Sequence, residues 1–124
     1  MIAADTSSLI AFFAADSGDD VTLIANALSS GEICLPPVVL TEVLSDLSSH
    51  NALRPVVSNW LLLEVLPEYW ERAGLLRATL IDRGYNPKVP DTLIAQSCID
   101  HDVALITRDT DFRHFAKHCG LRLV

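Results

Sequence analysis

The sequence predicts an α/β fold in which a parallel sheet of five strands is flanked by helices. Short apolar runs alternate with longer segments of helical period, which is the pattern of such folds. No internal repeat, low-complexity tract or Gly/Ser-rich linker interrupts this alternation. The length of 124 residues fits one domain spanning 1–124. Half of the residues are hydrophobic and only 20% are charged, so we expect a packed core.

The first half of the chain is expected to form two strands and three helices. Ser7 and Ser8 are suitable N-caps for the first helix. Pro36 and Pro37 end the second strand and suit the first turn of the helix that follows. The expected strands are 1–4 and 33–35, and the expected helices are 9–15, 20–30 and 38–48.

The second half is expected to form three strands and three helical segments. Tyr69, Ala73, Leu76 and Leu80 recur at helical spacing and predict one buried stripe along a long helix. Gly84 ends that helix. The expected strands are 62–66, 103–106 and 121–124, and the expected helical segments are 55–60, 67–83 and 90–100.

Four acidic residues fall at corresponding places in this pattern. Asp5 directly follows the first strand, and Asp109 follows the strand at 103–106. Glu42 and Asp91 lie near the starts of helices. Because the carboxyl ends of parallel strands open onto a common crevice, we expect all four side chains at one end of the sheet.

Each acid taken alone also suits a structural role. Asp5, Asp91 and Asp109 could be turn or cap residues, and Glu42 could lie on a solvated helix face. The position of Asp5 favours a site, because a charge beside an apolar strand is rarely buried without a partner. Converging carboxylates repel one another, and a divalent cation relieves that conflict. Hard oxygen ligands suit Mg²⁺ or Mn²⁺ better than zinc.

Charge and cysteine content bear on partners and location. The net charge of −7 argues against broad coating of duplex nucleic acid, which requires many basic contacts. The three cysteines, Cys34, Cys98 and Cys119, form no metal-binding pair and indicate reduced thiols. No apolar stretch reaches the roughly 20 residues of a membrane helix. We therefore expect a cytoplasmic protein that does not enter a membrane.

Three segments resemble the PIN-domain ribonucleases, particularly the VapC-like toxins of toxin–antitoxin pairs. They are DTSSLIAFF from Asp5, LPPVVLTEVL around Glu42, and DTLIAQSCIDHDVALITRDTDF from Asp91 to Phe112. The resemblance covers nearly the whole chain, although residues 50–85 match in pattern only. It implies a PIN-like three-layer sandwich and Mg²⁺- or Mn²⁺-dependent hydrolysis of RNA phosphodiester bonds.

The resemblance also assigns roles to individual residues. Asp5, Glu42, Asp91 and Asp109 fall on the family's catalytic, metal-binding acids, and Asp111 falls on an auxiliary acid. Hydroxyl groups that assist metal or phosphate correspond to Thr6, Ser7 and Thr107. The expected partners are an RNA substrate, an antitoxin protein whose C-terminal segment enters the groove, and a second copy of the chain. An apolar surface around Phe12, Leu28 and Val43 is a candidate for that homodimer contact.

Few basic residues are available to hold an RNA backbone. The candidates are Arg72, Arg77, Arg83 and Lys88 near one rim of the groove, and Arg108 and Arg113 near the other. Scattered solubilising surface charge explains the same set equally well. Alternation along the strand end is expected to point Arg108 away from Asp109. His114 and His118 share a helical spacing, but the pair lacks the intervening Glu of a zinc protease and is expected to be exposed.

Two other functions fit the same fold class less well. A non-catalytic PIN-like binding domain would keep the acids only as a surface, and metal titration distinguishes it from a nuclease. A receiver-like signalling domain would require paired acids after the first strand, whereas Thr6 and Ser7 follow Asp5.

Overall fold

The computed structural model describes residues 1–48 and 50–124. Within these residues, four parallel strands form one sheet in the order β3-β2-β1-β4. The strands are β1 (Ile2–Ala4), β2 (Ile33–Leu35), β3 (Leu61–Leu62) and β4 (Ala104–Ile106). The helices are α1 (Thr6–Phe13), α2 (Asp19–Ser29), α3 (Pro37–Leu44), α4 (His50–Val57), α5 (Tyr69–Asp82), α6 (Val89–Asp100) and α7 (Arg113–Cys119), with a 3-10 turn η1 (Thr110–Phe112) before α7.

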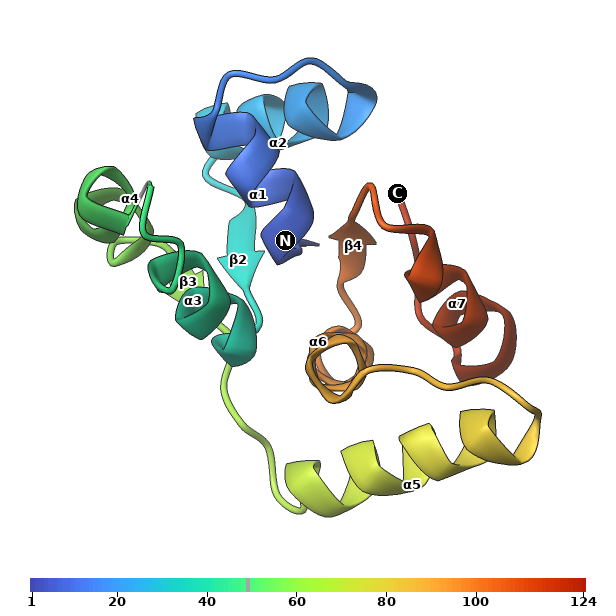
Figure 1. The fold of residues 1–124 in the computed structure, drawn as a ribbon. Helices are drawn as coiled ribbons and strands as arrows, with labels where there is room; N and C mark the ends of the chain where they lie inside the picture. The colour runs from blue at the N-terminus through green and yellow to red at the C-terminus, as the bar shows by residue number, and fades with distance from the viewer. Residues whose placement is uncertain (49) are drawn as a thin grey trace.

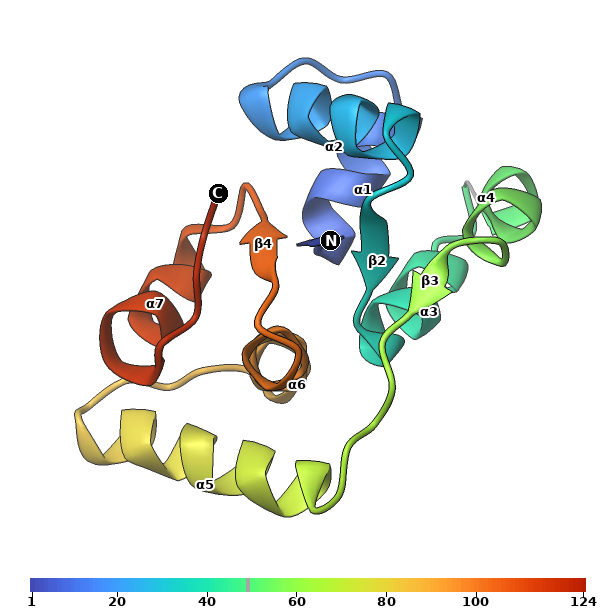
Figure 2. The ribbon, with the colours of Figure 1, turned by 180° about the vertical axis from the view of Figure 1, so that it is seen from behind.

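Helices surround the sheet on several sides. In Figure 1, α1 and α2 lie at the top, α3 and α4 at the left, α5 along the bottom and α7 at the right. The view from behind in Figure 2 shows the same arrangement, with α6 between the sheet and α5. Helix α5 packs against α6, and α3 packs against α1, α4 and α6. The expected α/β class with a parallel, helix-flanked sheet is confirmed. No helix among the described residues has both the length and the apolar character to cross a bilayer.

The predicted fifth strand at 121–124 is wrong. Leu123 makes one isolated parallel bridge with Leu105 beyond β4. Two backbone hydrogen bonds hold this segment, from the N–H of Leu105 to the carbonyl of Arg122 at 2.9 Å and from the N–H of Val124 to the carbonyl of Leu105 at 3.1 Å. The helix α7 ends at Gly120 in a left-handed conformation, and the residues after it run beside β4 for too short a distance to form a ladder.

The start of α1 also differs from the prediction. Asp5, not Ser7 or Ser8, is the N-cap, and its side chain accepts a hydrogen bond from the backbone N–H of Ser8 at 3.0 Å. The helix therefore begins at Thr6, immediately after β1. An N-cap of this type is worth about 1 kcal/mol. The same carboxylate thus begins the helix and faces the end of the sheet.

The middle of the chain is where the predicted bounds were least accurate. Strand β3 spans only two residues, and both side chains are exposed. It runs beside β2, with Leu35 paired to Leu62. The expected stripe on α5 is present, since Tyr69, Ala73 and Leu80 are buried. The helix begins after Glu68, which adopts a left-handed conformation with φ of 62°, rather than at Pro67.

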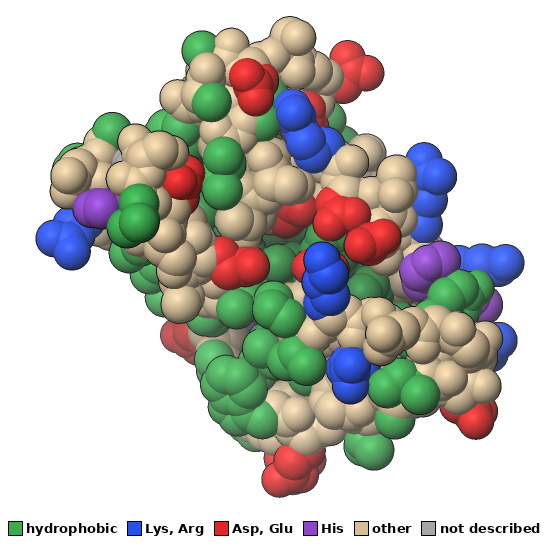
Figure 3. Space-filling view, in the orientation of Figure 1, with side chains coloured by type: hydrophobic (Ala, Val, Ile, Leu, Met, Phe, Trp, Pro, Cys, Tyr) green, Lys and Arg blue, Asp and Glu red, His purple; other side chains and the backbone are tan. Residues whose placement is uncertain are grey.

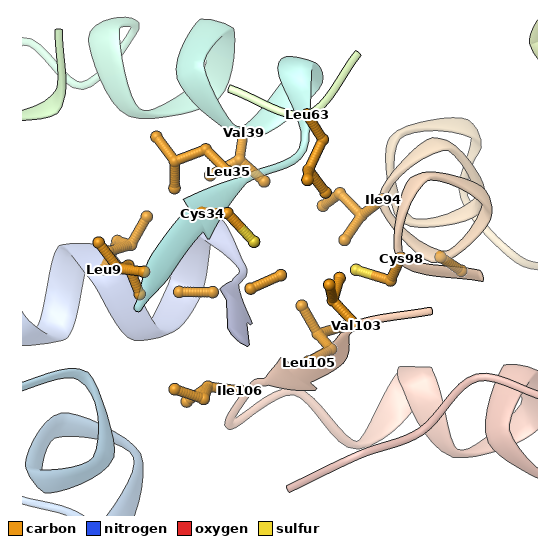
Figure 4. Packing of buried hydrophobic residues seen from close by; sticks show 14 of the residues in the cluster. Leu9, Cys34, Leu35, Val39, Leu63, Ile94, Cys98, Val103, Leu105 and Ile106 are labelled. Atoms are coloured by element: carbon orange, nitrogen blue, oxygen red, sulfur yellow. The ribbon is translucent and has the colours of Figure 1, made fainter. Parts of the chain in front are cut away.

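The core lies between the strands and the helices that cover them. Figure 4 shows Leu9, Leu35, Ile94 and Leu105 converging from α1, β2, α6 and β4. All three residues of β2 are buried, as expected for a central strand of a parallel sheet. Val43 is fully buried in this core, so it cannot form part of the exposed homodimer surface that the sequence suggested.

Candidate active site

An acidic hollow of about 250 Å³ opens at the carboxyl ends of β1 and β4. In Figure 3 acidic side chains gather at the middle of the face that carries α1, α3 and α6. The structure brings Asp5, Glu42, Asp91 and Asp109 to this one hollow. Its other lining residues are Thr6, Ser7, Lys88, Pro90 and Ile94. Four acids that are distant in the sequence therefore share one cavity.

Asp5 is the most deeply placed of these acids, with 3% of its surface exposed. Its Oδ2 accepts hydrogen bonds from the hydroxyl groups of Ser7 at 2.9 Å and Thr107 at 2.5 Å. Its Oδ1 accepts from the backbone N–H of Ser8. Burial raises the pKa of Asp5 above its usual range, although these donors act in the opposite direction. The donors fix the carboxylate in one orientation.

Glu42 is held from the adjacent helix. It lies on α3 and is half-buried. The hydroxyl group of Thr6 donates a hydrogen bond to its Oε1 at 2.7 Å. Because Thr6 is the first residue of α1, this bond links the start of α1 to α3. The position of Glu42 therefore depends on the same turn that presents Asp5.

A second group of acids lies beside Asp5 and Glu42. Asp91, Asp109 and Asp111 each offer an oxygen atom, and these atoms all lie within 4.8 Å of one another. Asp91 is in the first turn of α6, whereas Asp109 caps η1 by accepting from the N–H of Asp111 at 2.9 Å. Asp5 and Glu42 border the hollow but do not belong to this close trio.

The trio is electrostatically strained. Burial, followed by repulsion from Asp109 and smaller contributions from Glu42 and Asp111, raises the pKa of Asp91 to about 6. Lys88 is the charge that opposes this rise. In the part of the chain that the structure describes, no hydrogen bond reaches the carboxylate of Asp91 or that of Asp111. Their oxygen atoms are therefore available to a ligand.

Thr107 connects the two groups of acids. Its hydroxyl group accepts a hydrogen bond from the N–H of Asp109 at 3.0 Å and donates one to Asp5. The end of β4 thus holds both strand-end acids through one side chain. Ser7 and Thr6 also donate to acids, so all three predicted hydroxyl residues contact acids that line the hollow.

The donor set fits a hard divalent cation. Three carboxylates approach one another, and two of them accept no hydrogen bond among the described residues. Such a group suits Mg²⁺ or Mn²⁺, which prefer oxygen ligands. Neutral or soft ligands that would favour zinc do not line the hollow among the described residues. The site residues and the expected type of metal are chemically consistent.

The basic residues separate into paired and unpaired groups. Arg72 pairs with Asp100, and the guanidinium of Arg77 donates to the carbonyl of Pro87 at 2.8 Å. Arg108 pairs with Asp20 at 2.7 Å, so its predicted orientation away from Asp109 is confirmed. Lys88 is the basic residue that lines the acidic hollow in the described chain.

His114 lies nearer to the acids than its sequence pattern predicts. It was expected to be exposed, but it is half-buried and its ring lies 4.0 Å from that of Tyr85. It lines a smaller hollow together with Asp91 and Asp111. The spacing of His114 three residues after Asp111, on the turn into α7, was the signal that could have placed it near the acids.

Comparisons with known proteins agree with this fold. A model of the PIN domain matches residues 2–118. A chain in the crystal structure of VapBC2 from Rickettsia felis bound to a DNA fragment from their promoter is 20% identical, with a TM-score of 0.76, and the match covers 100% of this chain and 98% of that one. A chain in a toxin–antitoxin complex from Klebsiella pneumoniae is 22% identical, with a TM-score of 0.68 and coverage of 98% and 95%. No curated protein sequence matches.

The family match extends over every element that contributes an acid to the hollow, from β1 to α7. The predicted resemblance is therefore confirmed at the level of sequence family and of fold. The chain belongs to the PIN-domain family.

Proposed function

We propose that the chain is a metal-dependent endoribonuclease that acts as the toxin of a toxin–antitoxin pair. The observation that carries the proposal is the convergence of Asp5, Glu42, Asp91 and Asp109 around one hollow. Membership of the PIN-domain family and the fold shared with chains of two toxin–antitoxin complexes support it.

The close trio is the proposed holder of the metal. Asp91, Asp109 and Asp111 would bind Mg²⁺ or Mn²⁺ directly, and Asp5 and Glu42 would complete the site from the opposite wall. A bound divalent cation lowers the pKa of water and stabilises negative charge on a phosphate group. The hydroxyl groups of Thr6, Ser7 and Thr107 donate to the carboxylates of Asp5 and Glu42 and hold them in one orientation.

The proposed partners follow from the fold and the site. The substrate is RNA, whose phosphate group would lie against the metal-binding trio. An antitoxin protein would silence the site, as the complexes of the two structural relatives suggest. A homodimer and a cytoplasmic location remain predictions of the sequence.

The proposal can be tested by cleavage of single-stranded RNA oligonucleotides of randomised sequence. We expect cleavage with Mg²⁺ or Mn²⁺ and none with EDTA. Asp5→Asn should lower the rate at least roughly a hundredfold, because it removes one charge from a preorganised electrostatic site while keeping the size of the side chain. Circular dichroism should show that the variant stays folded.

Asp82→Asn is the matched control, because Asp82 is exposed at the end of α5, away from the residues that line the hollow. It should cleave at the wild-type rate. Full activity of Asp5→Asn, or metal-independent cleavage by both variants, would contradict the proposed function. Absence of metal binding in calorimetry would favour the non-catalytic alternative.

A further inference from the structure

A second hollow of about 120 Å³ adjoins the acidic one. It is lined by Asn86, Pro87, Lys88, Asp91, Asp111, His114 and Phe115. Lys88 and Asp91 line both hollows, so the two are neighbours across the start of α6. Figure 3 shows histidine and basic side chains at the α7 edge of the face on which the acidic side chains gather.

Three unpaired donors face this second hollow. In residues 1–48 and 50–124, the ammonium group of Lys88 forms no ion pair. The side-chain amide of Asn86 and the imidazole of His114 likewise form no hydrogen bond within that part of the chain. Arg72 and Arg108, by contrast, are neutralised by Asp100 and Asp20. The donors of the second hollow are therefore available to an acceptor from outside the chain.

The position of His114 is fixed by its aromatic neighbour. Its ring centre lies 4.0 Å from that of Tyr85, with an angle of 30° between the planes. The hydroxyl group of Tyr85 lies 3.2 Å from Nε2 of His118, which holds Tyr85 in turn. His114 is therefore a supported side chain rather than a free one, and it can present a ring nitrogen to a ligand without losing much conformational entropy.

The size and chemistry of the hollow suit a phosphate group. Its volume is about that of four water molecules in the liquid. A lysine ammonium, an imidazole and an amide are donors that contact phosphate oxygens in nucleic-acid complexes. Asp91 and Asp111 would repel the phosphate, so it would lie against Lys88 and His114 and away from these carboxylates.

We propose that Lys88, Asn86 and His114 form a subsite for the RNA phosphate adjacent to the one that is cleaved. This inference rests on the proposed function, because it takes the acidic hollow as the place of cleavage. It makes Lys88 the residue that links the two positions, since its side chain lines both hollows.

The test measures binding and not cleavage. A fluorescein-labelled single-stranded RNA octamer is titrated by anisotropy against protein that carries Asp5→Asn, in Mg²⁺ and at several salt concentrations. Adding Lys88→Gln should weaken binding roughly fivefold at moderate salt and reduce the slope of log K against log salt by about 0.7, the value for one phosphate contact on a single strand. Lys117→Gln is the matched control, because Lys117 is exposed on α7 and lines neither hollow.

A second measurement reports on His114 directly. The imidazole NMR signals of His114 should shift when the octamer is added, and adding Lys88→Gln should reduce that shift. Equal losses of affinity in Lys88→Gln and Lys117→Gln, or unmoved His114 signals, would overturn the subsite. Because neither measurement requires cleavage, a protein that binds RNA through Lys88 but never cleaves it would refute the proposed nuclease and leave Lys88 only as a phosphate contact.

Discussion

The two sides of the acidic hollow hold their charges in different ways. On one side Asp5 and Glu42 accept hydrogen bonds from the hydroxyl groups of Ser7, Thr107 and Thr6. On the other side the carboxylates of Asp91, Asp109 and Asp111 face one another, and burial and repulsion raise the pKa of Asp91 to about 6. On the first side, hydroxyl groups donate to both carboxylates. On the second side, the carboxylates of Asp91 and Asp111 accept no hydrogen bond among the described residues and are available to a ligand.

The difference separates positioning from binding. Donors on the Asp5 side fix two carboxylates whether or not an ion is present. In the trio, Asp91 and Asp111 accept no hydrogen bond among the described residues, so these carboxylates gain most when a cation binds. Substitutions on the two sides should therefore affect different measurements.

The largest expected effect is on the response of the trio to metal. Adding Mn²⁺ at about 100 times its Kd should raise the free energy of unfolding by about 2.7 kcal/mol, because the ion binds only the folded chain. Asp91→Asn should remove most of this gain, since it takes one of three converging ligands. Thermal denaturation with and without Mn²⁺ measures both values. Asp82→Asn should keep the full gain, and an unchanged gain in Asp91→Asn would place the metal elsewhere.

A smaller effect is expected on the pH dependence of the metal-free protein. The pKa of Asp91 is about 6 in the folded chain and about 3.9 in the unfolded one, so the folded state binds more protons between these values. The free energy of unfolding should therefore fall as the pH rises from about 4 to about 6. Asp91→Asn should lack this contribution and be more stable than the wild type at pH 7.

Because Asp91 is only half-buried, solvent screening limits that difference to about 1 kcal/mol. Urea denaturation in EDTA at pH 5 and pH 7 gives the comparison. The burial-raised pKa of Asp5 acts in the same direction in both proteins, so only the difference between them reports on Asp91. A wild type that gains as much stability as Asp91→Asn on raising the pH would contradict the strain described for the trio.

The smallest effect is expected from removing a hydrogen-bond donor on the side of the hollow that holds Asp5 and Glu42. Thr6→Val keeps the shape of the side chain but removes the donor to Glu42, at a cost of about 1 kcal/mol in stability. Cleavage should fall only severalfold, because Glu42 remains in place without being fixed. Thr79→Val is the control, since that hydroxyl group bonds to a carbonyl on the exposed face of α5. Equal effects of the two substitutions on cleavage would show that Thr6 has no positioning role.

The sequence predicted the parts of the site that depend on local signals. Asp5 and Asp109 follow apolar strands, so their place at the sheet end could be read from the pattern. Strand β2 was predicted at its observed bounds because two prolines end it. The fifth strand was not predictable in detail. Whether 121–124 pairs with β4 by a ladder or by a single bridge depends on where α7 ends and on the path of the residues that follow it.

Long-range contacts account for what the sequence left open. Nothing near His114 in the sequence indicates that Tyr85 packs against its ring. Likewise, only the resemblance to the PIN-domain family indicated Thr6 and Thr107, since no local signal shows that their hydroxyl groups reach Glu42 and Asp5. For Arg108, the sequence predicted the direction of the side chain but not its ion pair with Asp20.

The bond between Thr107 and Asp5 spans 102 residues of sequence. Because β4 pairs directly with β1, the acidic hollow cannot close until β4 has been made and has reached the first strand. A chain still emerging from the ribosome therefore carries its first acid without the partners that complete the cavity. Assembly of the hollow consequently requires both β1 and β4, and a chain truncated before Thr107 would lack one of the donors that hold Asp5.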